Sequence, residues 1–177
     1  MLRILIAIDG SALALDALHH ALELMRRGDL RATLVLGHVQ EEATLLELAT
    51  QGADAVARAS VEAAEHLLAP ALALAQAARV PYETEVGLGP VAATLVDMVE
   101  RCGCDALFIG ARGLGGLRGA LLGSVSQQLI HSSPVPVTVV KHSEPAPLDE
   151  MGEEGSDDLA DDGGAADAGS ADGAGAD

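Results

Sequence analysis

The chain has 177 residues, of which 49% are hydrophobic and 1% aromatic, and its formal net charge is −17. This length suits one domain with a tail, and the apolar content is ample for a single core. The acidic charge excludes the basic surface that nucleic acids or anionic membranes require, and two aromatic residues are too few for base stacking.

The acidic charge is concentrated at one end of the chain. Residues 144–177 hold twelve of the 27 acidic residues and none of the ten Lys and Arg residues, so residues 1–143 have a net charge of −5. A segment built mainly from Gly, Ala, Asp, Glu and Ser cannot offset its ordering entropy by burial. We therefore expect a folded domain over 1–143 and an acidic, disordered tail over 144–177. A solubilising tail is the simpler interpretation, and a partner-binding tail is the alternative.

Deleting residues 144–177 should leave the melting temperature of the domain almost unchanged. We expect this result because the tail has almost no large apolar side chain that could pack against a core. Thermal unfolding of the full and shortened chains, followed by circular dichroism, checks this expectation. A large drop in melting temperature would mean that the tail packs on the domain.

The first part of the chain shows a strand followed by a capped helix. The apolar run at 2–8 has the length of a strand buried on both faces, and Asp9-Gly10-Ser11 ends it. Either Asp9 or Ser11 can cap the next helix. Farther along, Gly52 is expected to divide a short helix from a longer one. Pro70 should break the longer helix or stand in the first turn of a new segment.

Strands and helices alternate along the whole domain, which is typical of a parallel α/β sheet. The predicted elements are a strand at 2–8, a helix at 12–27, a strand at 32–39, helical residues within 41–79, a strand at 82–86, a helix at 91–101, a strand at 105–109, a helix at 124–132 and a strand at 135–140. The alternating strand at 82–86 suits a sheet edge.

The last strand, 135–140, should also lie at a sheet edge. Pro134 and Pro136 flank or enter it, and proline cannot donate to a strand ladder. An apolar edge of this kind invites pairing with another chain unless something covers it. We therefore predict a homodimer formed through this strand.

Several kinds of chemistry find no support in the sequence. Two cysteines, Cys102 and Cys104, are too few for a structural zinc site or a disulfide framework and are interpreted as reduced thiols. The six histidines have no metal-ligand spacing, so surface or helix positions explain them best. The N-terminus lacks the features of a signal peptide, and no stretch approaches the roughly 20 apolar residues of a membrane span. We expect a cytoplasmic protein.

The most informative segment is the loop that begins at Gly110 and enters a helix near Ser124. Six of its first fourteen residues are glycine. Glycines let backbone N–H groups turn toward an anion, and the start of the helix adds its positive dipole end. The segment is neither a Walker A loop, because no Lys precedes Ser124, nor a dinucleotide fingerprint, which follows a first strand. Taken alone, it could also be a flexible loop without a ligand.

The spacing Gly110-x2-Gly113-x9-Gly123-Ser124 resembles the nucleotide-binding motif of the ATP-binding branch of the universal stress protein family. The opening ILIAIDGS and the closing SSPVPVTVVK are also similar to that family. The resemblance covers residues 1 to about 142. It implies an open, doubly wound, parallel five-stranded sheet of order 3-2-1-4-5, Rossmann-like and adenine nucleotide α-hydrolase-like, with helices on both faces. The first and fourth strands are then neighbours at a switch point, where ligands of such sheets bind.

The resemblance also assigns roles to individual residues. Asp9 would contact the nucleoside, the backbone of Val39 would contact adenine, and Arg112 occupies a variable motif position. The residues placed around ribose and phosphates are Gly110, Gly113, Gly123, Ser124 and Val125. The implied ligand is ATP, or AMP or ADP, with Mg²⁺ held mainly by the phosphates, since no carboxylate cluster marks a metal site. Asp9 can equally serve as a helix cap, and the Val39 side chain as a core residue.

The function implied by the resemblance is a nucleotide-binding stress or regulatory protein, with slow or no ATP hydrolysis and no assigned catalytic residue. One alternative is a dimerisation module of the same fold without nucleotide, although the glycine motif is intact. A less favoured alternative is an ATP-using enzyme of the wider group, because Asp9-Gly10-Ser11-Ala12 departs from the Ser-Gly-Gly-rich loop of those enzymes.

Overall fold

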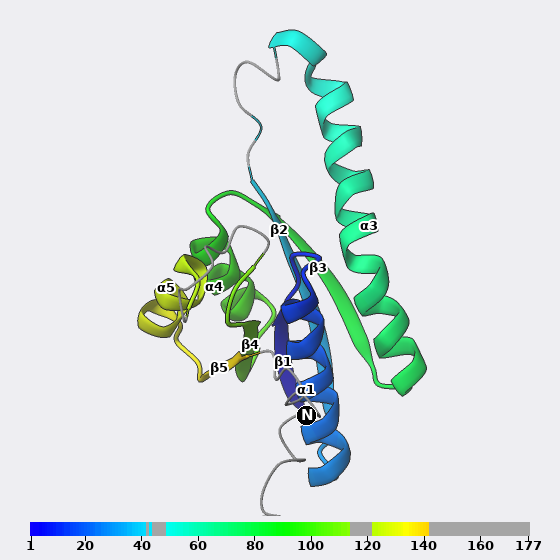
Figure 1. Cartoon of the computed structure of the whole chain (residues 1–177), viewed down its shortest axis with the longest axis vertical. Helices are drawn as coiled ribbons and strands as arrows, with labels where there is room; N and C mark the ends of the chain where they lie inside the picture. Colours follow the sequence, from blue (N-terminus) through cyan, green and yellow to red (C-terminus); the bar gives the residue numbers. More distant parts are fainter. Residues whose placement is uncertain (42, 44–48, 114–121, 142–177) are drawn as a thin grey trace, which may run out of the picture. The chain divides into compact units, whose positions relative to one another are not determined.

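The computed structural model describes residues 1–41, 43, 49–113 and 122–141; the tail at 144–177 and the part of the glycine-rich loop at 114–121 lie outside the described residues. The strands are β1 (Leu2–Ala7), β2 (Ala32–Gln40), β3 (Tyr82–Leu88), β4 (Ala106–Gly110) and β5 (Val137–Val140). The helices are α1 (Ala12–Gly28), α3 (Ala53–Ala78), α4 (Val91–Arg101) and α5 (Ser124–Ser132). The strands form one parallel sheet of order β3-β2-β1-β4-β5 (Figure 1), which confirms the predicted fold class.

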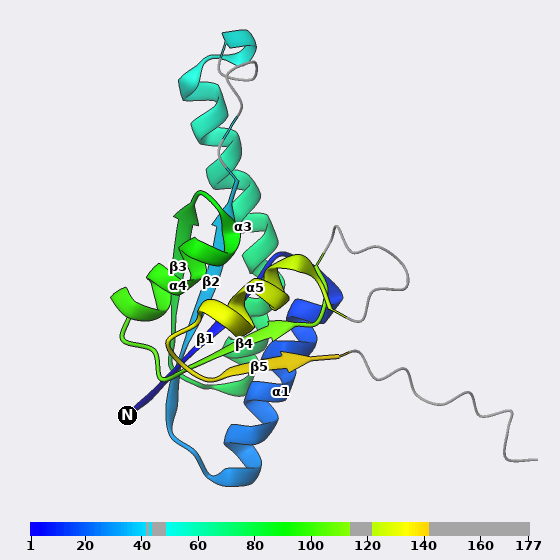
Figure 2. The same ribbon diagram turned by 90° about the vertical axis from the view of Figure 1, so that its left-hand side faces the viewer.

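Helices cover both faces of the sheet and divide the core in two. Side chains alternate along each strand, so Ile4 and Ile6 of β1 pack with α1 and α3, whereas Leu5 packs with α4 and α5. Figures 1 and 2 show α1 and α3 on one side of the sheet and α4 and α5 on the other. The apolar runs that form β1, β2 and β4 are therefore buried on both faces, as a parallel sheet requires.

The turn between β1 and α1 is fixed by two side chains. The Ser11 hydroxyl accepts a hydrogen bond from the Ala14 amide at 3.2 Å and is the N-cap of α1. The Asp9 carboxylate accepts one from the Ser11 amide at 2.9 Å. Of the two predicted caps, Ser11 therefore caps the helix, and Asp9 orders the turn that leads into it.

The expected break at Pro70 is wrong, because α3 continues through it from Ala53 to Ala78. Pro70 is exposed, so water can solvate the carbonyl that a proline leaves without its helical donor. Gly52, with a φ of 81°, separates α3 from the helical residues 49–51, as predicted. In the described part of the chain, no helix combines the length and apolarity needed to cross a membrane.

Both predicted edge strands lie at the edges of the sheet, β3 on one side and β5 on the other. β5 begins at Val137 rather than at 135, so both prolines precede the strand. The Pro136 carbonyl accepts a hydrogen bond from the Leu107 amide at 3.0 Å, but proline has no N–H to return. The ladder with β4 therefore starts one residue after Pro136.

Both cysteines are free thiols at the end of α4, as the sequence predicts. Cys104 is buried, and this burial, together with the nearby Cys102, raises the pKa of its thiol to about 11 from an ordinary value of 9.0. Burial also raises the pKa of Cys102. The raised pKa values disfavour thiolates at neutral pH, which makes a redox role for the pair unattractive.

The stability of the domain should therefore fall between pH 9 and pH 11 through Cys104. Because its pKa is higher in the folded chain, the unfolded chain loses this proton first as the pH rises, and unfolding becomes more favourable. Urea unfolding at a series of pH values should show a steeper decline for the natural chain than for Cys104→Ala. Identical slopes would contradict the assignment.

Candidate functional site

A cavity of about 800 Å³ lies at the carboxyl ends of β1, β2 and β4. Its position is the point where the order of the sheet reverses, between β1 and β4. Its volume lies within the range of about 300–1,000 Å³ that is typical of small-molecule sites. The structure brings all eight predicted site residues into its lining: Asp9, Val39, Gly110, Arg112, Gly113, Gly123, Ser124 and Val125.

Two of these residues, Asp9 and Gly113, are 104 positions apart in sequence but lie next to each other in the cavity lining. Gly113 lies so close to Asp9 that a Cβ atom at position 113 would overlap the carboxylate oxygen Oδ2 of Asp9. Because Gly113 has no side chain, the Asp9 carboxylate can lie directly beside it in the cavity lining. Neither residue's sequence context alone could reveal this approach.

Gly110 has a structural reason to be glycine. A Cβ atom at this position would lie 2.8 Å from the carbonyl carbon and oxygen of Leu13, in the first turn of α1. This backbone cannot move aside without moving the helix. Gly110 therefore lets β4 pass close to α1, and this packing brings the end of β4 next to the end of β1.

The start of α5 faces the same cavity without a side-chain cap from the described residues. Its N-cap, Gly123, has φ of −74° and ψ of 161°, and the following Ser124 is exposed. The first amides of a helix have no partner within it and attract anions, helped by the helix dipole. The end of α5 that lines the cavity therefore has the character of an anion-binding surface.

The expectation that the main-chain amides of the whole loop serve a ligand needs correction. The Gly123 amide donates to the Ala111 carbonyl at 2.7 Å, and the Ala111 amide donates to the Val140 carbonyl at 2.7 Å. These two donors hold the loop against β5 and α5. Among the described loop amides, those at the start of α5 thus remain as candidates to contact an anion.

Val39 lies at the carboxyl end of β2, where the sequence predicts it. Its half-buried side chain packs against the apolar cluster beneath α4 and α5, so the alternative of a core side chain is correct. Val39 also lines the cavity.

The charges in the described lining are few. Asp9 and Glu41 are acidic and Arg112 is basic. No group of three or more His, Cys, Asp and Glu residues in the described chain could hold a metal ion. The described lining thus offers main-chain donors and one guanidinium group to an anion, together with the carboxylates of Asp9 and Glu41.

The sequence interpretation missed His38, which is buried in β2 and lines the cavity; for this residue, a surface or helix position is wrong. Its Nδ1 lies 2.8 Å from the Ile8 carbonyl oxygen. The signal was a histidine inside the largely apolar run at 32–39, directly before Val39. Two more lining residues, Leu67 and Ser126, were also missed, because their approach depends on how α3 and α5 pack.

Replacing Gly113 with alanine should weaken ligand binding without unfolding the domain. The added methyl group would push the Asp9 carboxylate out of its position, whereas a side chain can turn away at small cost to packing. We expect affinity for adenosine to fall roughly tenfold, equivalent to about 1.4 kcal/mol. Calorimetric titration beside a thermal melt checks this, and an unchanged affinity would contradict the proposed role of the pair.

Comparison with known proteins agrees with this architecture. A model described as the Universal stress protein family matches residues 1–141. Universal stress protein MJ0531 from Methanocaldococcus jannaschii is 28% identical over an alignment that covers 78% of this chain and 81% of that protein.

Solved structures share the fold at lower identity. An Arabidopsis thaliana universal stress protein family protein, At3g01520, with AMP bound, has a TM-score of 0.60 and 20% identity, covering 81% of this chain and 93% of that one. A universal stress protein in complex with cAMP has a TM-score of 0.58 and 21% identity, covering 78% and 96%.

Proposed function

The chain belongs to the universal stress protein family, and from this we propose that it binds an adenine nucleotide in the cavity at β1 and β4. The ligand is ATP, or AMP or ADP, and the protein has a stress-response or regulatory role. The observation that carries the proposal is the meeting of Asp9 with the uncapped start of α5 in one cavity of suitable volume. Relatives that hold AMP and cAMP support the adenine nucleotide class.

The two ends of the cavity suit the two ends of a nucleotide. The Asp9 carboxylate can accept hydrogen bonds from ribose hydroxyl groups, and the backbone at Val39 can contact adenine. The start of α5, with Gly123, Ser124 and Val125, suits the phosphates, and Arg112 can add charge. When ATP is bound, Mg²⁺ would be coordinated mainly by phosphate oxygens and water.

We propose that the bound nucleotide is hydrolysed slowly or not at all. The acidic residues in the described lining are Asp9 and Glu41, and the Asp9 oxygen Oδ1 already accepts a hydrogen bond from the Ser11 amide. The protein would therefore act through the bound nucleotide rather than through its turnover. Product release from ATP under steady-state conditions distinguishes this protein from an ATP-using enzyme.

We also propose that two copies associate through β5. This strand is an edge of the sheet, its four residues are half-buried, and it is short. A second β5 would satisfy the outward-facing backbone groups of the edge. Light scattering coupled to size exclusion should give the molar mass of a dimer; a monomer at micromolar concentration would contradict the proposal.

Isothermal titration calorimetry of the full chain tests the main proposal. ATP, ADP, AMP and adenosine should each bind with one site per chain, and GTP should bind at least about tenfold more weakly than ATP. The purified protein should also release adenine nucleotide on denaturation if binding is tight. If none of the adenine compounds binds, the chain is a module of this fold without nucleotide function.

A further inference from the structure

Three polar side chains are buried in the described part of the chain: Ser11, His38 and Ser126. Ser11 caps α1. His38 and Ser126 both line the cavity, from β2 and from α5, and each contacts a backbone carbonyl at the end of a neighbouring strand. Buried polar groups are kept where they make such contacts, so each of these bonds has a local structural purpose.

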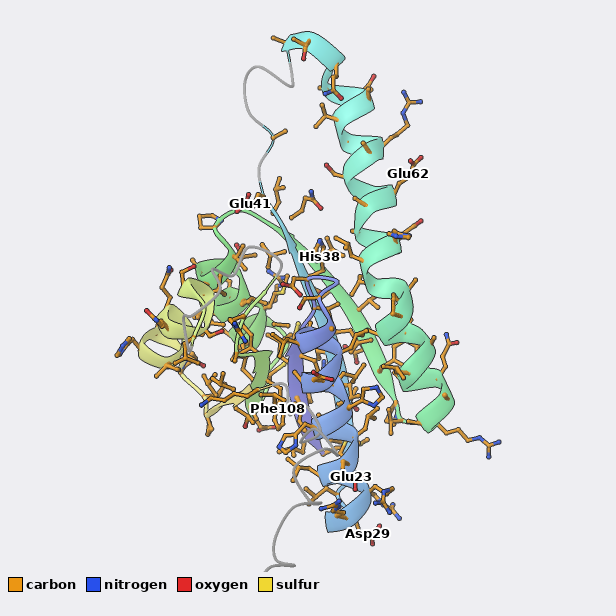
Figure 3. The ribbon with its side chains drawn as sticks, viewed as in Figure 1. Glu23, Asp29, His38, Glu41, Glu62 and Phe108 are labelled. Carbon is orange, nitrogen blue, oxygen red and sulfur yellow. The ribbon has the colours of Figure 1, made fainter. Side chains whose placement is uncertain are left out.

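His38 holds the residue that precedes Asp9. The paired register of β1 and β2 ends at Ala7 and Gly37. Beyond it, the Ile8 amide donates to the Gly37 carbonyl at 2.8 Å, and the Ile8 carbonyl faces Nδ1 of His38, also at 2.8 Å. Since a carbonyl can only accept, Nδ1 carries the proton and donates. Figure 3 shows His38 near the carboxyl end of β2, beside the loop that leads into α1.

The position of the Asp9 carboxylate depends on this bond. The Ile8 carbonyl belongs to the peptide unit that joins Ile8 to Asp9, so its direction sets the backbone of Asp9 from one side. From the other side, Asp9 is held by the amide of Ser11. Its Oδ2 then reaches the space beside Gly113. Without the donor on His38, the Ile8 carbonyl would lose its partner, and the turn carrying Asp9 could rotate.

We infer that His38 is a positioning residue for the nucleoside end of the ligand, acting through the Ile8 carbonyl on Asp9. The inference rests on the proposed function, since it takes adenine nucleotides as the ligand. It adds a residue to that site whose side chain acts through the backbone of a neighbouring strand. The imidazole supplies a hydrogen bond that the strand ladder cannot make once the register has ended.

Ser126 in α5 provides the matched comparison. Its hydroxyl donates to the Gly110 carbonyl at 3.0 Å, which joins α5 to the end of β4. This bond is of the same kind and equally buried, but it supports the side of the cavity assigned to the phosphates. The two bonds should therefore affect different parts of one ligand.

The test compares adenosine and ATP in calorimetric titrations of the full chain and its variants. Leu and Asn branch at the same atom, so His38→Leu and His38→Asn differ mainly in the donor that Asn keeps close to the position of Nδ1. His38→Leu should weaken adenosine and ATP by the same factor, roughly tenfold, and His38→Asn should bind nearly as well as the natural chain. Ser126→Ala should weaken ATP more than adenosine.

The outcomes separate the inference from the proposed function. Adenosine affinity unchanged in His38→Leu overturns the inference, and so does His38→Asn binding as poorly as His38→Leu, which would indicate packing alone. If the natural chain binds neither ligand, the proposed function fails first. Thermal melts accompany each titration. If His38→Leu does not fold, His38→Gln takes its place. The amide donor of Gln lies one bond farther out than Nδ1 of His38, so this variant should also bind adenosine weakly.

Discussion

A chain with Gly123 replaced by valine should lose ATP affinity by at least about 100-fold, or about 2.7 kcal/mol, while keeping its fold. The backbone at Gly123 is extended, a conformation that valine adopts readily, and a Cβ atom there would meet the Ala111 oxygen and the Arg112 Cα at an ordinary 3.5 Å. The remaining methyl groups would occupy space at the start of α5, where the phosphates are expected. Calorimetric titration with ATP measures the loss.

Gly123→Ala is the control for this substitution. Its single methyl group makes the same ordinary contacts but fills less of the cavity, so its ATP affinity should lie between those of the natural chain and the valine variant. Both variants should melt close to the natural chain, because glycine makes no side-chain cap that either would remove. Undiminished ATP binding by Gly123→Val would place the phosphates elsewhere.

Gly110→Ala should instead destabilise the domain, by about 1–3 kcal/mol in the free energy of unfolding. The new Cβ atom would lie 2.8 Å from the main chain of Leu13, so α1 or β4 must shift. Because the atoms in conflict belong to the backbone, no change of side-chain rotamer can relieve the overlap. Urea unfolding, read by circular dichroism, gives the change directly.

Comparison with Gly123→Ala makes the Gly110 prediction specific. Both residues are glycines that line one cavity, but only position 110 has backbone within 3 Å of the added atom. Alanine should thus lower the free energy of unfolding at position 110 and leave it almost unchanged at position 123. Equal midpoints in urea would show that α1 adjusts at little cost.

Much of the fold could be predicted because its signals are local. The strand β1 is an unbroken apolar run that ends at Asp9, and Ser11 stands where a helix needs a cap. The prolines at 134 and 136 predicted the edge position of β5, which the sheet order confirms, although both residues precede the strand. In contrast, the effect of Pro70 depends on which side of α3 it occupies, and only the packed structure shows that this side is exposed.

The site was predictable in its composition but less so in its geometry. The glycine spacing and Asp9 indicated which residues to bring together, and the structure places them around one cavity. Three features needed the tertiary structure: the approach of Gly113 to Asp9, the bond of His38 to Ile8, and the use of the Gly123 amide by Ala111. Each joins segments that sequence alone cannot place side by side.

The order of the sheet also has a consequence for synthesis on the ribosome. β1, β2 and β3 are consecutive in the chain and adjacent in the sheet, so they can pair as soon as they emerge. β4 inserts beside β1 only about a hundred residues after β1 was made, and α5 follows later still. A nascent or truncated chain that ends before residue 124 would carry Asp9 without the helix that faces it. A ligand that contacts both Asp9 and α5 would therefore bind chains whose synthesis has passed α5, and would not bind shorter ones.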